Sequence, residues 1–239
     1  MIPPTFVYDD LNRLGIELSQ RRIGRVSNYL DLLLHANKQF NLTAVRDPNT
    51  AWQRHIIDSL TLLPALEWLP ECSRIIDLGS GGGLPGIPLA IARPDLHVIL
   101  LEATRKKARF LQQCVETLSL AKVSVVNQRA ETIGQDPAHR QQYDVAVCRA
   151  IGAMNVLLEF ALPLLKVRGK LLAMKGPQVE TELNAAANAI DVLGAGEVAV
   201  SNAYPDGFDC NTAIVTITKI QPTPKIYPRR PGVPKQSPL

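Results

Sequence analysis

Residues 75–88 read IIDLGSGGGLPGIP, and five of the 15 glycines of the chain fall within eight of these positions. An apolar segment of strand character leads directly into the glycines. Because glycine has no side chain, such a loop allows the protein backbone to come close to a ligand. In an open parallel sheet, ligands bind beyond the carboxyl ends of the strands. The stretch therefore predicts a strand followed by a ligand-binding loop.

Around this stretch, from about residue 73 onward, short apolar segments alternate with helical ones. Strand, helix and strand in repetition predict an α/β fold with a mostly parallel sheet and helices on both faces. The predicted strands number seven, and the turn-rich segment YPDGFD favours an antiparallel pairing of the last two. Their sequences are RIIDLG, HVILLE, VSVVNQ, YDVAVC, KLLAMK, EVAVSN and TAIVTIT.

The chain divides into three predicted parts. Residues 1–70 have apolar side chains at helical spacing and are interpreted as an N-terminal helical extension. Residues 71–220 form the α/β domain, which contains the seven predicted strands. Residues 221–239 hold six of the 18 prolines, four basic residues and no acid, so they carry the whole net charge of +4. Such a composition predicts an extended basic tail, which is either a solvated end or an arm for RNA phosphates.

Composition excludes several classes of protein. At 46% hydrophobic and 20% charged residues, the chain is typical of a globular protein, and no apolar run is long enough to span a membrane. No signal-peptide pattern is visible, and the four cysteines are far apart, without a C-x-x-C or Cys/His cluster. We therefore expect a cytoplasmic location with reduced thiols, no metal site and no membrane contact, and we expect a monomer by default.

The glycine loop has the pattern acid-x-G-x-G-x-G, formed by Asp77, Gly79, Gly81 and Gly83. A dinucleotide fingerprint counted from Gly79 fails at its third glycine, and the absence of G-K-[ST] excludes a P-loop. At the end of the second predicted strand, 25 residues after Asp77, stands Glu102, whose carboxylate suits the two hydroxyls of a ribose. The pattern resembles motif I of the S-adenosylmethionine-dependent methyltransferases, and this resemblance implies a Rossmann-like methyltransferase fold for residues 71–220. A turn with only a structural role and a dinucleotide site are the alternatives.

Other segments narrow the resemblance. They are FNLT at 40–43, RHIIDS at 54–59, DLGSGGGLPGIPLA at 77–90, CRA at 148–150, LLAMKG at 171–176 and the terminal YPRRPGVPKQSPL. Together, over nearly the whole chain, they resemble the bacterial ribosomal RNA small-subunit methyltransferase G family, also called glucose-inhibited division protein B. The resemblance implies methyl transfer from S-adenosylmethionine to N7 of a guanine in 16S rRNA, with the rRNA or the small ribosomal subunit as partner.

The resemblance and the motif together imply a set of cofactor contacts. These fall on the glycine loop and on the segments that follow the second, third and fourth predicted strands. Two of the residues have other interpretations, since Arg149 could pair with a helix acid and Glu131 could simply favour a helix N-terminus. The set is Asp77, Gly79, Ser80, Gly81, Gly83, Leu84, Glu102, Ala103, Thr104, Ala130, Glu131 and Arg149.

No catalytic side chain is expected for this reaction. Guanine N7 carries a lone pair and no proton, so its methylation requires no general base. Carbon-5 methylation of cytosine would instead need a cysteine nucleophile, and Cys148 lies near the corresponding place. That cysteine lacks a preceding proline and a nearby histidine. It is also one small departure from the family pattern, in which a serine is common at this position.

Basic residues in three places are candidates for RNA contacts. Arg105, Lys106, Lys107 and Arg109 open a predicted helix, where cations oppose the helix dipole unless an anion lies nearby, although a solvated face is the alternative. Lys175 follows the fifth strand and either meets RNA or merely ends the strand. The tail adds Arg229 and Arg230.

His55 and Asp58 share a helical face and either stabilise that helix or act at the substrate entrance.

Two functions outside the preferred one stay open. A non-catalytic RNA-binding or assembly factor with the same fold would have no need of Asp77 and Glu102. A methyltransferase for another substrate would have no need of the basic tail and helix.

Overall fold

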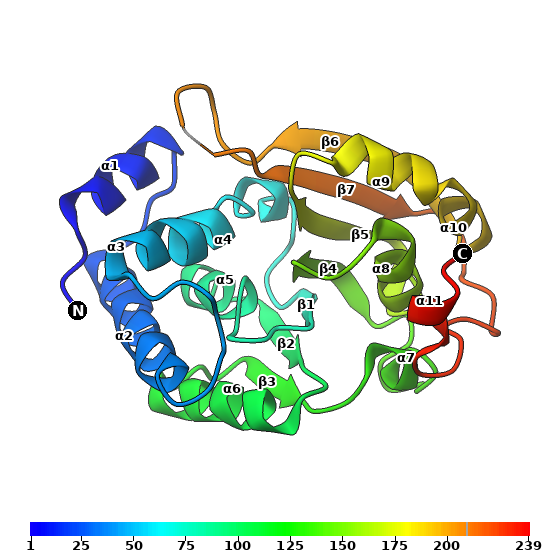
Figure 1. Ribbon diagram of the computed structural model, residues 1–239, viewed down its shortest axis with the longest axis horizontal. Helices are drawn as coiled ribbons and strands as arrows, with labels where there is room; N and C mark the ends of the chain where they lie inside the picture. The colour runs from blue at the N-terminus through cyan, green and yellow to red at the C-terminus, as the bar shows by residue number, and fades with distance from the viewer. Residues whose placement is uncertain (209) are drawn as a thin grey trace.

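A computed structural model describes residues 1–208 and 210–239, and its seven-stranded sheet confirms the predicted α/β fold (Figure 1). The strand order is β3-β2-β1-β4-β5-β7-β6. The strands β1 to β5 are parallel, and β7 is antiparallel to both β5 and β6. The strands are β1 Arg74–Leu78, β2 His97–Leu101, β3 Val123–Val126, β4 Tyr143–Arg149, β5 Leu165–Lys175, β6 Ala195–Asn202 and β7 Ala213–Lys219.

The central strands are apolar on both faces because both faces are covered. Alternate residues of a strand point to opposite sides, so Ile75 of β1 joins one hydrophobic cluster and Ile76 joins the other. On the first side lie α1 to α6, and on the second lie α7 to α10. The strand order reverses between β2 and β4 on either side of β1, so the loop after β1 lies at a switch point of the sheet.

The helices of the first face include the whole N-terminal segment. Buried side chains from Val7 to Leu69 share one cluster with β1 and α5, and α2 begins where the Ser19 hydroxyl accepts a hydrogen bond from the Arg22 N–H. Residue 70 as a domain boundary stays a prediction. The elements are α1 Thr5–Arg13, α2 Gln20–Asn37, α3 Pro48–Ala51, the π-helix η1 Trp52–Ile57, α4 Asp58–Leu60, the 3-10 helix η2 Pro64–Leu66, α5 Gly86–Ala92 and α6 Arg105–Thr117.

The second face carries shorter helices. In this part of the chain α8 is the most buried, with seven of its eight residues inside. The end of the chain approaches α7 and α8 on this side (Figure 1). The elements are α7 Ala130–Ile133, α8 Met154–Ala161, α9 Val179–Ala185, α10 Ala187–Val192 and α11 Val233–Gln236.

The C-terminal segment 221–239 corrects the prediction of an extended tail. The Arg229 side chain donates to both oxygens of the Glu159 carboxylate, which is fully buried in α8. Arg140 donates to the backbone carbonyls of Thr223, Pro224 and Tyr227. A proline-rich segment has few N–H groups but keeps all its carbonyls as acceptors, and here one arginine side chain binds three of them. The segment is therefore docked on the domain rather than free of it.

The ion pair between Arg229 and Glu159 should be important for stability. Arg229→Ala would leave a carboxylate uncompensated in the interior, which typically costs about 3–5 kcal/mol. The matched control is Lys235→Ala, which removes an exposed cation from the same segment. Urea unfolding should show a lower midpoint for Arg229→Ala and almost no change for the control. Equal midpoints for the two variants would mean that the ion pair between Arg229 and Glu159 does not contribute to stability.

Candidate active site

The glycine loop follows β1 and is fixed by its own backbone conformation. Gly79, Gly81 and Gly83 have φ values of +59°, +57° and +100°, in a region that residues with a Cβ avoid. The Ser80 N–H donates to the Leu101 carbonyl of β2 (2.9 Å), so the loop bends toward the neighbouring strand. At this bend Gly79 is exposed and Gly81 is half-buried, at the carboxyl edge of the sheet.

Asp77, near the end of β1, binds the backbone that follows the glycine loop. Its Oδ2 accepts a hydrogen bond from the N–H of Gly86 (3.0 Å), and a Cβ at position 86 would lie only 2.6 Å from that oxygen. The other oxygen, Oδ1, is buried without a hydrogen-bond partner. Burial raises the pKa of Asp77 to about 7. A buried acceptor without a partner, facing a ligand loop, fits a cationic group such as the ammonium of a methionine moiety.

Glu102 joins the loop to the end of β2. Its Oε2 accepts from the Gly81 N–H (3.0 Å) and its Oε1 from the Thr104 N–H (2.7 Å). Each carboxylate oxygen keeps a further lone pair for a ligand hydroxyl. The Asn127 side chain donates to the carbonyls of Glu102 and Ala103 and so holds this segment in place. Sequence reasoning missed Asn127, although it stands near the carboxyl end of the predicted strand VSVVNQ, where ligand-binding residues gather in parallel sheets.

The N-terminal helices hold the loop from outside. The Tyr29 hydroxyl, fully buried in α2, donates to the Gly82 carbonyl (2.8 Å). A Cβ at Gly82 would lie 2.8 Å from Leu33 Cδ1, so α2 packs directly on the loop. From the sequence, Tyr29 was one apolar position of a helix, and nothing in the spacing indicated that its hydroxyl reaches the loop.

Arg149 ends β4, the strand next to β1, and it contacts the N-terminal helices. Its guanidinium lies 3.3 Å from Asp58 Oδ2 and 3.3 Å from His55 Nδ1. The structure therefore contains the ion pair with a helix acid that was the alternative interpretation of Arg149, and the acid is Asp58 of α4. Since arginine only donates, His55 Nδ1 accepts, and its Nε2–H bonds to Thr43 Oγ1 (2.8 Å). Burial and then the Arg149 charge lower the pKa of His55 to about 4, so the ring is neutral near pH 7.

A cavity of about 850 Å³ opens beside this network. The Tyr204 and Thr212 hydroxyls reach into the same network by donating to Asp58 Oδ1. His55 and Asp58 thus meet through Arg149 rather than as a simple helix-stabilising pair. The cavity is lined by Val45, Gln53, Arg54, His55, Asp58, Arg149, Ala150, Pro177, Tyr204, Cys210, Asn211 and Thr212.

The predicted cofactor residues gather at one edge of the sheet. The loop residues and residues 102–104 follow β1 and β2, while Ala130 and Glu131 follow β3. The Glu131 carboxylate accepts from the Gly232 N–H (3.0 Å), so its side chain binds the C-terminal segment. Their contacts with a cofactor stay predictions.

Cys148 is buried, and burial raises the pKa of its thiol well above the usual range, which does not favour a thiolate nucleophile.

The predicted RNA residues divide into exposed and buried cations. Arg105, Lys106, Arg109 and Arg230 are exposed, and Lys107 is partly buried. Lys175 is buried, where its ammonium donates to Glu182 Oε2 (2.6 Å) and the Gly152 carbonyl (2.8 Å). Lys175 therefore forms an ion pair with Glu182, as Arg229 does with Glu159, so these two cations are already neutralised within the protein. Among the described residues no group of three or more His, Cys, Asp or Glu side chains could hold a metal ion.

The raised pKa of Asp77 predicts a pH-dependent stability. Between about pH 4 and 7 the folded protein retains the Asp77 proton, which the unfolded chain has released. Unfolding then releases a proton, so the free energy of unfolding falls as the pH rises across this window. Asp77→Asn has no such proton, and its stability relative to the native chain should rise from pH 4 to 7 by up to about 4 kcal/mol. Denaturant unfolding across this range would check it, and parallel curves for the two proteins would contradict it.

Comparison with known proteins gives one family. Residues 22–206 match the family model of rRNA small subunit methyltransferase G. Relatives with that name from Moorella thermoacetica and Chloroflexus aggregans are 44% and 45% identical, in each case over 94% of this chain and 93% of the relative.

Solved structures agree on the fold. A predicted O-methyltransferase from Agrobacterium tumefaciens matches with a TM-score of 0.55 at 20% identity, covering 68% of this chain and 81% of that one. A precorrin-6y C5,15-methyltransferase from Geobacter metallireducens matches with a TM-score of 0.50 at 18% identity, covering 69% and 88%. The predicted Rossmann-like methyltransferase fold is confirmed, and the chain belongs to the rRNA small subunit methyltransferase G family.

Proposed function

We propose that this methyltransferase binds S-adenosylmethionine at the glycine loop and methylates N7 of a guanine in 16S rRNA. One observation carries the cofactor assignment, namely that the loop is bordered by two buried carboxylates, Asp77 and Glu102. A pyrophosphate would lie against the Glu102 carboxylate and the Asp77 carboxyl group, whereas a cofactor that has an ammonium, a sulfonium and ribose hydroxyls but no phosphate finds acceptors there. The substrate follows from family membership, since the relatives are named for small-subunit rRNA.

The residues at the loop have distinct roles in this proposal. Glu102 accepts the ribose hydroxyls, Asp77 faces the methionine ammonium, and the loop from Gly79 to Leu84 covers the cofactor through its backbone. Ala103, Thr104, Ala130 and Glu131 border the adenine. S-adenosylmethionine supplies an electrophilic methyl group on its sulfonium.

The protein's contribution to methyl transfer is then positioning. Guanine N7 has a lone pair and no proton to lose, so the chain would have to align that lone pair with the methyl group of the bound cofactor rather than move a proton. No base or nucleophile is needed, in agreement with the lowered pKa of His55, about 4, which makes its ring a weak base, and with the buried thiol of Cys148. Arg149 and the cavity beside it border the place where the base must enter.

The predictions for RNA contacts, oligomeric state and location follow from this function. Exposed Arg105, Lys106, Arg109 and Arg230, with Lys107, are proposed to contact rRNA phosphates. Lys175 and Arg229 would act indirectly, because each is held by a carboxylate. A monomer in the cytoplasm stays a prediction. Among the described residues no helix has the length and apolarity that crossing a membrane requires.

The cofactor site predicts how two variants bind S-adenosylmethionine. Gly81→Val would place a β-branched residue at φ +57°, where it is strained, and would displace the N–H that bonds Glu102. Glu102→Ala would remove the ribose acceptors. Calorimetry should show at least about tenfold weaker binding in each case, the loss of about 1.4 kcal/mol. Gly24→Ala, on an open part of α2, is the control with unchanged affinity. Native affinity in a folded Gly81→Val protein would contradict the site.

The reaction itself is tested by mapping the product. The protein, S-adenosylmethionine and unmethylated 16S rRNA should yield one 7-methylguanosine, located by mass spectrometry of nuclease fragments. Small subunits lacking the modification form a second substrate that shows whether assembled RNA is required. A methyl group on cytosine C5 or on an exocyclic amine would overturn the N7 assignment. Binding without transfer to either substrate would favour the non-catalytic RNA-binding factor.

A further inference from the structure

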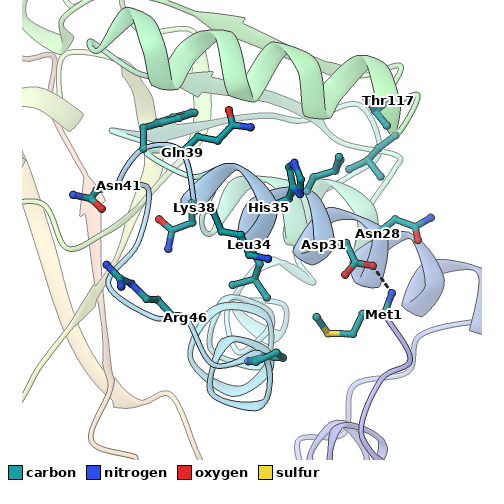
Figure 2. Close-up of a pocket in the computed structure, with 15 residues that line it drawn as sticks. Met1, Asn28, Asp31, Leu34, His35, Lys38, Gln39, Asn41, Arg46 and Thr117 are labelled. Carbon is teal, nitrogen blue, oxygen red and sulfur yellow. Dashed lines mark hydrogen bonds and ion pairs between the residues drawn. The ribbon is translucent and has the colours of Figure 1, made fainter.

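A second hollow lies on the outside of the N-terminal helices. This groove, which we call the α2–α6 groove, lies between α2, the segment 38–48 and the end of α6, and its volume is about 1120 Å³ (Figure 2). Figure 2 shows Lys38 beside the end of α2 and Arg46 across the hollow on the following segment. The lining residues are Met1, Asn28, Asp31, Leu32, Leu34, His35, Asn37, Lys38, Gln39, Phe40, Asn41, Arg46, Pro48, Thr117 and Leu118.

The charge of the α2–α6 groove is positive and uncompensated. Asp31 is its single acidic lining residue, and the amino group of Met1 pairs with that carboxylate. Lys38 and Arg46 are exposed, and neither side chain has an ion-pair or hydrogen-bond partner among the described residues. The amides of Gln39 and Asn41 are exposed as well. Two free cations and several amides fit a polyanion with hydrogen-bonding edges, rather than an apolar partner.

The α2–α6 groove is continuous with the basic start of α6. The Phe40 ring packs edge-on against Phe110 of α6, with centroids 6.3 Å apart. Lys106 Nζ lies 4.5 Å from the centre of the same Phe40 ring. The free cations Lys38 and Arg46 therefore belong to the same face as Lys106, through one shared aromatic residue. An extended polyanion could contact both sets of cations at once.

The wall of the α2–α6 groove also borders the glycine loop. A Cβ at Gly82 would lie 3.8 Å from Leu42 Cβ, so the segment that follows Phe40 packs against the loop. Asn37 fixes this segment, because its side-chain oxygen accepts from the N–H groups of Leu42 (2.8 Å) and Thr43 (3.0 Å). The groove is thus separated from the proposed cofactor site by one short, well-anchored piece of chain.

We propose that the α2–α6 groove binds the sugar–phosphate backbone of single-stranded rRNA next to the target nucleotide. This proposal rests on the proposed function, because it takes the guanine to lie at the glycine loop. Guanine N7 faces the deep major groove of A-form RNA, so the target must be in a loop or an opened helix. Lys38 and Arg46 bind successive phosphates of that strand, and the strand continues over the Leu42 segment toward the cofactor edge.

The test compares charge removal in the groove with the same charge removal elsewhere. The variant Lys38→Gln/Arg46→Gln loses two cations, and the control Arg21→Gln/Arg22→Gln loses two from the opposite end of α2. Binding to a loop fragment of 16S rRNA is titrated across a salt series. In the groove variant the slope of log affinity against log salt should drop by about 1.5 units, with about tenfold weaker binding near 0.1 M salt. The control should match the native protein.

Two further measurements separate this proposal from the proposed function. Calorimetry should show native S-adenosylmethionine affinity in both variants, and the native protein should methylate the RNA. Photo-crosslinking of 4-thiouridine RNA should label a peptide within residues 38–48. If the native protein methylates RNA but the groove variant keeps the native salt slope, the groove proposal is wrong and the groove is free for another partner, such as an acidic peptide. If the native protein neither binds nor methylates 16S rRNA or small subunits that lack the modification, both proposals are wrong.

Discussion

The hydrogen bond between the Gly81 N–H and the Glu102 carboxylate connects the ends of β1 and β2, and the rest of the site depends on it. It goes with a left-handed backbone at Gly81, and it holds the Glu102 carboxylate beside the glycine loop at the carboxyl edge of the sheet. Asp77 supports the same loop from below, through Gly86, and Tyr29 holds it from outside, through Gly82. With the loop held from three directions, little reorganisation is left for ligand binding, which is the condition for catalysis by positioning.

The N-terminal helices are therefore part of the site rather than an addition to it. Tyr29 contacts the glycine loop, while the η1 and α4 residues His55 and Asp58 orient Arg149 at the end of β4. Thr43 extends this network to the segment that walls the α2–α6 groove. A chain of hydrogen bonds thus links the proposed RNA-binding groove to the strand ends at which the reaction is proposed to occur.

Sequence reasoning was most successful where a local pattern determines local structure. Alternation of strand and helix predicted the sheet, and the acid and glycines of 77–83 predicted the loop. Sequence reasoning failed for the C-terminal segment. Its proline content indicates an extended backbone, but it does not show that Arg229 pairs with the buried Glu159 of another element. It could not separate Lys175 from the exposed cations either, since the partner, Glu182, is brought close only by the fold. Contacts such as that of Tyr29 with Gly82 join residues 53 positions apart and leave no local signal.

A crystal structure of the protein with S-adenosylmethionine is the most direct test of this account. We expect the cofactor at the carboxyl edge of β1 and β2, with its ribose hydroxyls on Glu102 and its ammonium near Asp77 Oδ1. The methyl group should face the cavity beside Arg149. A cofactor bound in the α2–α6 groove, or one that leaves Glu102 and Asp77 without contact, would contradict the assignment of the glycine loop as the active site.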